Sequence, residues 1–158
     1  MYNSAYVKRS AGEHMDLYTI GYEGLTIREF INNLSKNNIS IVADIRFNPI
    51  SRKQGFSKRI LCEELAKKGI GYIHFKELGT PKDVRDKFKQ TNDEKIFSRK
   101  YKRILEAKQQ LLFYLCELVK TSTVALMCFE KDPEKCHRTL LAEEIQIISG
   151  NCLTVFSI

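Results

Sequence analysis

Residues 41–75 read IVADIRFNPISRKQGFSKRILCEELAKKGIGYIHF, a segment that contains a strand, a helix and a second strand in immediate succession. The apolar, β-branched residues 41–45 are typical of a strand that is buried on both faces. Ser57 is in position to cap the helix that follows, and Gly69 ends it. Residues 72–75 form the next strand. This order predicts a βαβ unit, in which the two strands are parallel.

The same alternation continues on both sides of this unit. Further strands are expected at residues 17–20, 123–128 and 152–156, and further helices after Thr26, at 83–88, over 93–120 and around Leu141, Ile145 and Ile148. Strands that alternate with helices predict an α/β fold: a single three-layer domain with a mostly parallel sheet of about five strands flanked by helices. In such a sheet the functional loops lie beyond the carboxyl ends of the strands.

The length of 158 residues is that of one domain. Residues 1–14 are polar and aperiodic, and we expect them to be a disordered extension or an expression leftover, so that residues 15–158 form the α/β domain. No apolar run approaches the roughly 20 residues that span a bilayer, and the N-terminus lacks the pattern of a signal peptide. We therefore expect no membrane association.

Five cysteines occur without regular spacing, which argues against a disulfide framework and favours the reducing cytoplasm. Three of them, Cys62, Cys116 and Cys152, have apolar neighbours within expected helices and strands, so they are predicted to be small core residues.

The formal net charge is +7, and much of it comes from residues 76–110, which contain eleven Lys or Arg and six Asp or Glu. Such a stretch can attract phosphate groups. It can equally be a solvated helix face with ion pairs between successive turns.

Polar side chains follow four of the expected strands. They are Tyr22 and Glu23 after the first strand, Asp44, Arg46, Ser51 and Arg52 after the second, His74 at the end of the third, and Cys128, Glu130, Cys136, His137 and Arg138 after the fourth. Because the carboxyl ends of parallel strands meet at one edge of the sheet, these residues are predicted to share one site.

Asp44 and Arg46 lie two residues apart and therefore point to the same face. A buried aspartate is costly unless it is paired, so the two can form a structural clamp that shapes the loop. The alternative is that Arg46 and Arg52 bind an anion and Asp44 orients them.

Cys128 ends a strand ahead of a helix start and of Arg138. A helix N-terminus and an arginine both favour a thiolate, so this is the setting of a nucleophilic cysteine, although a buried and inert strand cysteine remains the alternative. The following segment, Cys136-His137-Arg138, offers backbone N–H groups and cationic side chains that can cradle an anion. His137 can act as a general acid or base, or simply pack at the helix start.

Four residues offer possible N and S ligands for a metal ion: Cys128, Cys136, His137 and His74. The Cys-x7-Cys-His spacing differs from the C-x2–4-C of structural zinc sites, so no metal is predicted. No cofactor is predicted either, because the chain has no Walker loop, no G-x-G-x-x-G and no H-E-x-x-H.

At these motifs the sequence resembles the prokaryotic domain-of-unknown-function family numbered 488. The matching segments are YTIGYEG (18–24), ADIRFNPISR (43–52), Tyr72-x-His74, Leu78-Gly79 and LMCFEKDPEKCHR (126–138), and the resemblance extends over nearly all of the chain after Met15. It implies a compact α/β fold with a shared polar site, but no reaction. The sequence departs from the family pattern at Phe47 and Asn48, and at Thr80, where another glycine is usual and the loop below the site is expected to differ.

A looser similarity is to rhodanese-like and cysteine-phosphatase domains. They too have a strand that ends in Asp-x-Arg and a cysteine ahead of an arginine-bearing helix. Ten positions separate Cys128 from Arg138, however, which is too long for the tight anion loop of those enzymes.

The leading hypothesis is one anion-binding site for a phosphate-bearing ligand, a nucleotide or nucleic acid, on which the protein could also act as an enzyme. Arg46, Arg52 and Arg138 would hold the anion, and Cys128 or His137 would perform chemistry, oriented by Asp44 and Glu130. Two alternatives stay open. One is a non-catalytic nucleic-acid-associated module that uses residues 76–110, and the other is a thiol redox or sulfur-transfer protein that uses Cys128 and Cys136.

Overall fold

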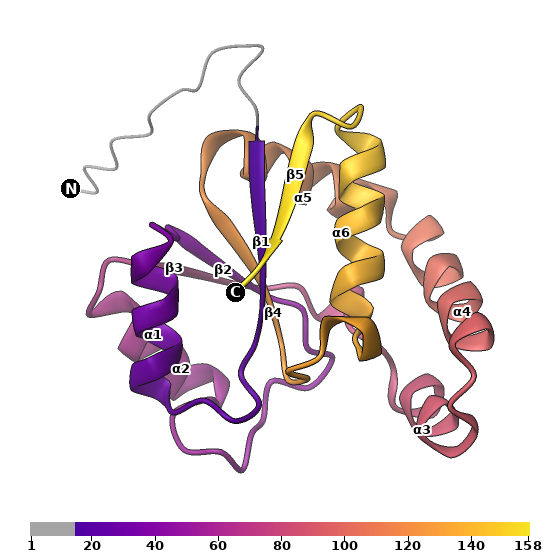
Figure 1. The fold of residues 1–158 in the computed structure, drawn as a ribbon, viewed down its shortest axis with the longest axis horizontal. Coiled ribbons are helices and arrows are strands. Elements are labelled where there is room, and N and C mark those ends of the chain that lie inside the picture. Colours follow the sequence, from indigo (N-terminus) through magenta and orange to yellow (C-terminus); the bar gives the residue numbers. More distant parts are fainter. Residues whose placement is uncertain (1–14) are drawn as a thin grey trace.

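The computed structural model describes residues 15–158, so the expectation for residues 1–14 lies outside the described part of the chain. Within these residues one parallel sheet has the strand order β3-β2-β4-β1-β5 (Figure 1). The strands are β1 (Met15–Gly21), β2 (Ile41–Asp44), β3 (Gly71–His74), β4 (Val124–Cys128) and β5 (Leu153–Ser157). The predicted α/β fold with a parallel, helix-flanked sheet is confirmed.

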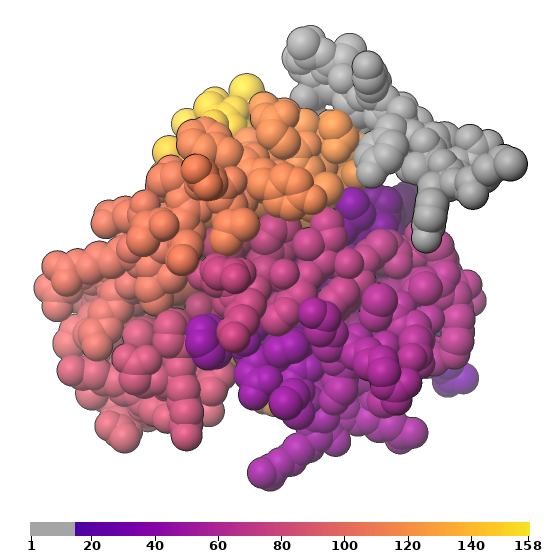
Figure 2. Space-filling model, turned by 180° about the vertical axis from the view of Figure 1, so that it is seen from behind, coloured from indigo at the N-terminus to yellow at the C-terminus, as the bar shows by residue number. Residues whose placement is uncertain are grey.

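Helices cover both faces of the sheet. One face packs against α1 (Ile27–Lys36) and α2 (Lys58–Ala66), and the other against α4 (Glu94–Glu106), α5 (Gln109–Thr121) and α6 (His137–Ile148). The helix α3 (Lys82–Thr91) lies beside α4, and the short 3-10 helices η1 (Lys76–Leu78) and η2 (Pro133–Lys135) sit in loops (Figure 1). In the view from behind, the pink-to-orange surface of α3, α4 and α5 adjoins the magenta surface of residues from α2 and β3 (Figure 2).

Strand β4 shows how the two cores form. All five of its residues are buried, and successive side chains alternate between the faces. Leu126 joins the core beneath α4, α5 and α6, whereas Met127 joins the core beneath α1 and α2. A central strand that is covered on both faces needs an apolar residue at every position, and this is why residues 124–128 form an unbroken apolar run.

The single helix expected over residues 93–120 is wrong. The chain forms α4 and α5, with a break at Ala107 and Lys108, where Lys108 has φ −125° and ψ 30°. The apolar period continues through the break, so the sequence does not mark it. The tertiary structure does: both helices pack against α6, but α4 also contacts α3, whereas α5 contacts β1 of the sheet.

Two cysteines expected in the core are exposed, while Cys116 is buried as predicted. Cys62 follows the inward-facing Leu61 on α2 and is turned about 100° away from it, toward solvent. Cys152 lies in the turn before β5.

The helix expected after Thr26 is capped by that residue, whereas the cap expected at Ser57 does not form. Thr26 caps α1 with a reciprocal bond to Glu29. Ser57 occupies the N-cap position of α2, but its hydroxyl bonds the backbone of Ser51 instead of the helix.

The strand order opens a crevice at the carboxyl edge of the sheet. The chain leaves β1 and β2 toward the face of α1 and α2, and it leaves β3 and β4 toward the opposite face. Neighbouring strands β2 and β4 therefore send their loops in opposite directions, which is the arrangement that creates ligand sites in open α/β sheets. No helix among residues 15–158 is both long and apolar enough to cross a membrane.

Candidate functional site

A pocket of 780 Å³ lies at this carboxyl edge. Its walls come from the loops after β1, β2 and β4, from Thr80 and from helices α3 and α4. Eight of the twelve site residues expected from the sequence line it: Tyr22, Arg46, Ser51, Arg52, Cys128, Glu130, Cys136 and His137. Asp44, Arg138, Glu23 and His74 are not in its lining, so the structure brings most of the expected residues together, but not all of them.

Asp44, Arg46, Tyr22 and Tyr72 are joined by hydrogen bonds, and we call these four residues the Asp44 cluster. Arg46 donates to both carboxylate oxygens of Asp44, with Nε–Oδ1 at 2.9 Å and Nη2–Oδ2 at 2.6 Å. Tyr72 donates to the same carboxylate at 2.6 Å, and Arg46 Nη1 donates to the Tyr22 hydroxyl and to the Phe56 carbonyl. Asp44 is fully buried and Arg46 is 5% exposed.

The charges of the Asp44 cluster are matched within it. Burial by itself would lower the pKa of Arg46, but the hydrogen bonds and the charge of Asp44 outweigh it and raise that pKa above its usual value. Burial and the bond to Asp44 also raise the pKa of the Tyr72 hydroxyl. These contacts support the structural clamp more than an anion site, because most Arg46 donors are already engaged.

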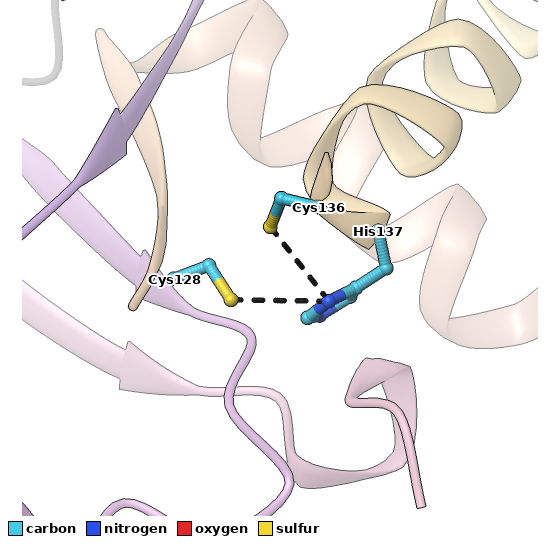
Figure 3. A group of neighbouring side chains, drawn as sticks. All are labelled: Cys128, Cys136 and His137. Atoms are coloured by element: carbon cyan, nitrogen blue, oxygen red, sulfur yellow. Dashed lines mark hydrogen bonds between the residues drawn. The ribbon is translucent and has the colours of Figure 1, made fainter. Parts of the chain in front are cut away.

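Cys128, Cys136 and His137 form a second group, which we call the thiol–imidazole cluster (Figure 3). Cys128 is the last residue of β4, Cys136 is the N-cap of α6, and His137 is the first residue of that helix. Their two sulfurs lie 3.8 and 3.9 Å from His137 Nδ1, and all three atoms lie within 4.8 Å of one another. All three residues are buried.

The backbone of the loop after β2 orients His137. Its Nε2 lies 3.0 Å from the carbonyl oxygen of Ile45. A carbonyl can only accept, so Nε2 carries a proton and donates it. Nδ1 then presents either a lone pair or a second proton to the two sulfurs.

Glu130 borders this cluster. The thiol of Cys128 donates to its Oε2 at 2.9 Å. Burial raises the pKa of Glu130, but the bond from Cys128, the loop backbone and nearby His137 lower it by more. Burial raises the pKa of Cys136 well above its usual value. Burial alone lowers the pKa of His137, whereas Cys136, the Ile45 carbonyl and Glu130 raise it by more.

Arg138 supports the loop after β4. It is 1% exposed, and it donates to the backbone carbonyls of Glu130 and Lys131. The same loop rests on Gly21, where a Cβ atom would overlap the Glu130 carbonyl. These contacts leave Arg138 facing the loop backbone, with only its Nε unpartnered among the described residues.

Glu23 and His74, two expected site residues that lie outside the pocket, connect loops. Glu23 accepts a bond from the backbone N–H of Lys131 at 2.9 Å, which joins the loops after β1 and β4. His74 Nε2 lies 2.8 Å from the carbonyl oxygen of Arg46. Within the pocket, Ser51 accepts a bond from the Tyr22 hydroxyl at 3.3 Å.

Basic residues that the sequence did not single out also line the pocket. Arg85 and Lys89 come from α3, and Lys135 comes from η2. Within residues 15–158 the side chains of Arg52, Arg85 and Lys89 have no hydrogen bond and no ion pair. The i, i+4 spacing of Arg85 and Lys89 was the available signal, because it places both on one helix face.

The pocket wall also contains aromatic rings and one unpartnered hydroxyl. Phe47 and Phe129 are 37% and 44% exposed, and Phe88 and Phe97 stack with their centroids 4.5 Å apart. Thr80 is 4% exposed, and its hydroxyl has no partner among the described residues. This is the position at which the sequence departs from the glycine expected after Leu78-Gly79.

Comparison with known proteins gives one family. The family model described as "Domain of unknown function DUF488" matches residues 26–145, which is more than half of the chain. No curated protein and no solved structure matches the chain.

Proposed function

This chain belongs to the DUF488 family of domains of unknown function, and we propose that its pocket binds a nucleotide. The observation that carries the proposal is that exposed aromatic rings and unpaired basic side chains line one pocket. Aromatic faces stack with nucleobases, and guanidinium and ammonium groups bind phosphate.

The charge balance of the pocket favours a phosphate group. Its lining contains the basic residues Arg46, Arg52, Arg85, Lys89 and Lys135 and the acidic residues Asp86 and Glu130. Because Arg46 is engaged with Asp44 and Lys135 lies 3.8 Å from Asp132, the phosphate is assigned to Arg52, Arg85 and Lys89. Arg138 is left out of this assignment, since its donors face the loop backbone.

The size and the aromatic lining support a ligand larger than an inorganic anion. A volume of 780 Å³ falls within the range of about 300–1,000 Å³ that holds small molecules and cofactors. Phe47 and Phe129 both present ring surface to solvent at the pocket. We assign the base to this aromatic wall, and the buried Thr80 hydroxyl to a hydrogen bond with the ligand.

Chemistry on the ligand is assigned to the thiol–imidazole cluster. Cys128, His137 and Glu130 line the pocket, whereas Asp44 is buried away from it. We therefore place any reaction at this cluster, with Glu130 beside it, and remove Asp44 from the catalytic residues expected from the sequence.

Binding can be tested by calorimetric titration of the full chain with ribonucleoside monophosphates and triphosphates. Removing one charge-assisted hydrogen bond costs about 1.5–3 kcal/mol, so Arg52→Ala and Arg85→Ala are each expected to weaken binding roughly tenfold or more. Arg59→Ala is the matched control, because Arg59 is exposed on α2 and pairs with Glu63 outside the pocket. An absence of nucleotide binding, or an equal loss in Arg59→Ala, would contradict the proposal.

The second candidate function is nucleic-acid binding on a different surface, which titration with an oligonucleotide can test. The outer face of α4 carries Lys95, Arg99, Lys102 and Arg103 around a shallow hollow, together with Glu94 and Glu106. If this face binds nucleic acid, affinity for a single-stranded oligonucleotide falls steeply as salt rises, and Arg99→Ala with Arg103→Ala flattens that slope. Binding of oligonucleotides but not of mononucleotides would favour this face over the pocket.

A further inference from the structure

We propose that Cys128, Cys136 and His137 bind one zinc ion, whose fourth coordination position opens into the pocket. The residues come from the end of β4 and the start of α6, and their three donor atoms converge within 4.8 Å (Figure 3). The proposal does not depend on nucleotide binding, since it rests on the donor atoms alone.

The distances fit a tetrahedral ion. Zinc–sulfur bonds of about 2.3 Å and zinc–nitrogen bonds of about 2.0 Å at a tetrahedral angle place sulfur and nitrogen about 3.5 Å apart. Here the two sulfurs lie 3.8 and 3.9 Å from His137 Nδ1, so a small inward movement of the side chains is enough. Thiolate and imidazole together are a donor set that selects zinc over magnesium or calcium.

The second observation is the orientation of His137. Metal-bound histidines usually donate their other ring N–H to a backbone carbonyl or a carboxylate. His137 Nε2 donates to the Ile45 carbonyl at 3.0 Å, which keeps the ring in place with Nδ1 directed at both sulfurs.

The linear spacing that argued against zinc is overcome by the fold. Closely spaced cysteine pairs belong to structural sites in which one turn supplies both ligands. In this chain the loop after β4 leaves the strand and returns, so that the N-cap Cys136 comes to lie near Cys128. Arg138 fixes the path of that loop through the carbonyls of Glu130 and Lys131.

The open position follows from the number of ligands and from the pocket. Two cysteines and one histidine form a three-ligand set of the kind found in catalytic zinc sites, in which water or substrate occupies the fourth position. All three residues line the pocket, as does Glu130. Zinc displaces both thiol protons, so Glu130 loses its bond from Cys128 and becomes free to accept one from the water at the fourth position.

Zinc content of the full chain is the primary test. Protein purified under reducing conditions and dialysed after addition of zinc is expected to retain one zinc per chain by mass spectrometry. Replacement by cobalt should give sulfur-to-cobalt charge-transfer absorption and the visible bands of a tetrahedral site. The proposal would be overturned if the unaltered, reduced and folded chain retained no metal. It would also be overturned by an octahedral cobalt spectrum without thiolate absorption. Neither result depends on a variant that could misfold.

Variants locate the ion. Cys128→Ser, Cys136→Ser and His137→Asn are each expected to lose the metal, whereas the control Cys116→Ser keeps it, because Cys116 is buried on α5 outside the cluster. Full retention of zinc by folded Cys128→Ser would contradict the assignment, as would a Cys128–Cys136 disulfide that persists under reducing conditions. Glu130→Gln is expected to keep one zinc, and its loss there would show that Glu130 fills the fourth position, against the open site.

Discussion

The Asp44 cluster and the thiol–imidazole cluster lie at the same edge of the sheet, but they differ in how far their polar groups are satisfied. Asp44 accepts bonds from Arg46 and Tyr72 at 2.6–3.1 Å, and it does not line the pocket. The contacts of His137 Nδ1 with the two sulfurs are longer, at 3.8 and 3.9 Å, and all three residues line the pocket. Polar groups that satisfy one another hold a loop in place, whereas the Nδ1 atom and the two sulfurs, which converge at longer distances beside the pocket, remain available to a ligand.

The largest expected effect comes from opening the Asp44 cluster. Asp44→Ala leaves the buried guanidinium of Arg46 without its partner, and loss of one member of a buried ion pair costs about 3–5 kcal/mol. Urea unfolding measures this loss. Asp83→Ala, at an exposed position of α3, is the control and should change stability by less than about 0.5 kcal/mol. A similar small change in Asp44→Ala would remove the architectural role assigned to this cluster.

A smaller effect is expected where the loop after β4 rests on β1. Gly21→Ala places a Cβ atom against the Glu130 carbonyl, and overpacking of this kind costs about 1–3 kcal/mol. Gly71→Ala is the matched control, because its nearest neighbour would be Ile41 at 3.4 Å, an ordinary contact. Since the same loop leads from Cys128 to Cys136 and so positions two of the proposed zinc ligands, Gly21→Ala should also reduce zinc retention. Equal stability of the two variants would contradict this prediction, because it would show that the loop after β4 can move away from the added Cβ atom at little cost.

Thr80 separates stability from binding. Thr80→Val removes a buried hydroxyl that has no partner among the described residues, so the ligand-free protein should gain up to about 1 kcal/mol. Nucleotide affinity should fall at the same time, because the ligand loses a hydrogen bond. Thr80→Ser keeps the hydroxyl and should retain affinity. The measurements are thermal unfolding without ligand and calorimetric titration with it, and an unchanged affinity in Thr80→Val would exclude Thr80 from the ligand site.

The smallest effect is expected at the exposed cysteines. Cys62→Ser and Cys152→Ser should change stability by less than about 0.5 kcal/mol, since neither side chain belongs to a core. Alkylation of the native chain followed by peptide mass spectrometry should modify these two before Cys128 and Cys136, and added zinc should protect only the latter pair. Fast modification of Cys136 in the presence of zinc would contradict the cluster.

The sequence predicted the elements that depend on local pattern. Alternating apolar strands and amphipathic helices indicated the parallel sheet, and the position of Asp44 two residues before Arg46 indicated their pairing. The break at Ala107 and Lys108 could not be predicted, because the apolar period runs through it. The exposure of Cys62 depends on its rotation about the axis of α2, and its apolar neighbours obscured this.

For the candidate site, too, the sequence determined some features and the tertiary structure determined the others. The sequence by itself determined that Arg46, Cys128 and His137 follow strand ends, since parallel strands bring such ends to one edge. Only the tertiary structure decided that Arg138 faces backbone carbonyls, that Arg85 and Lys89 reach the pocket, and that Cys136 lies near Cys128. The physical reason is that periodicity records which face of a helix or strand is buried, whereas convergence of side chains depends on the paths of loops, and those paths are set by contacts between residues far apart in the chain.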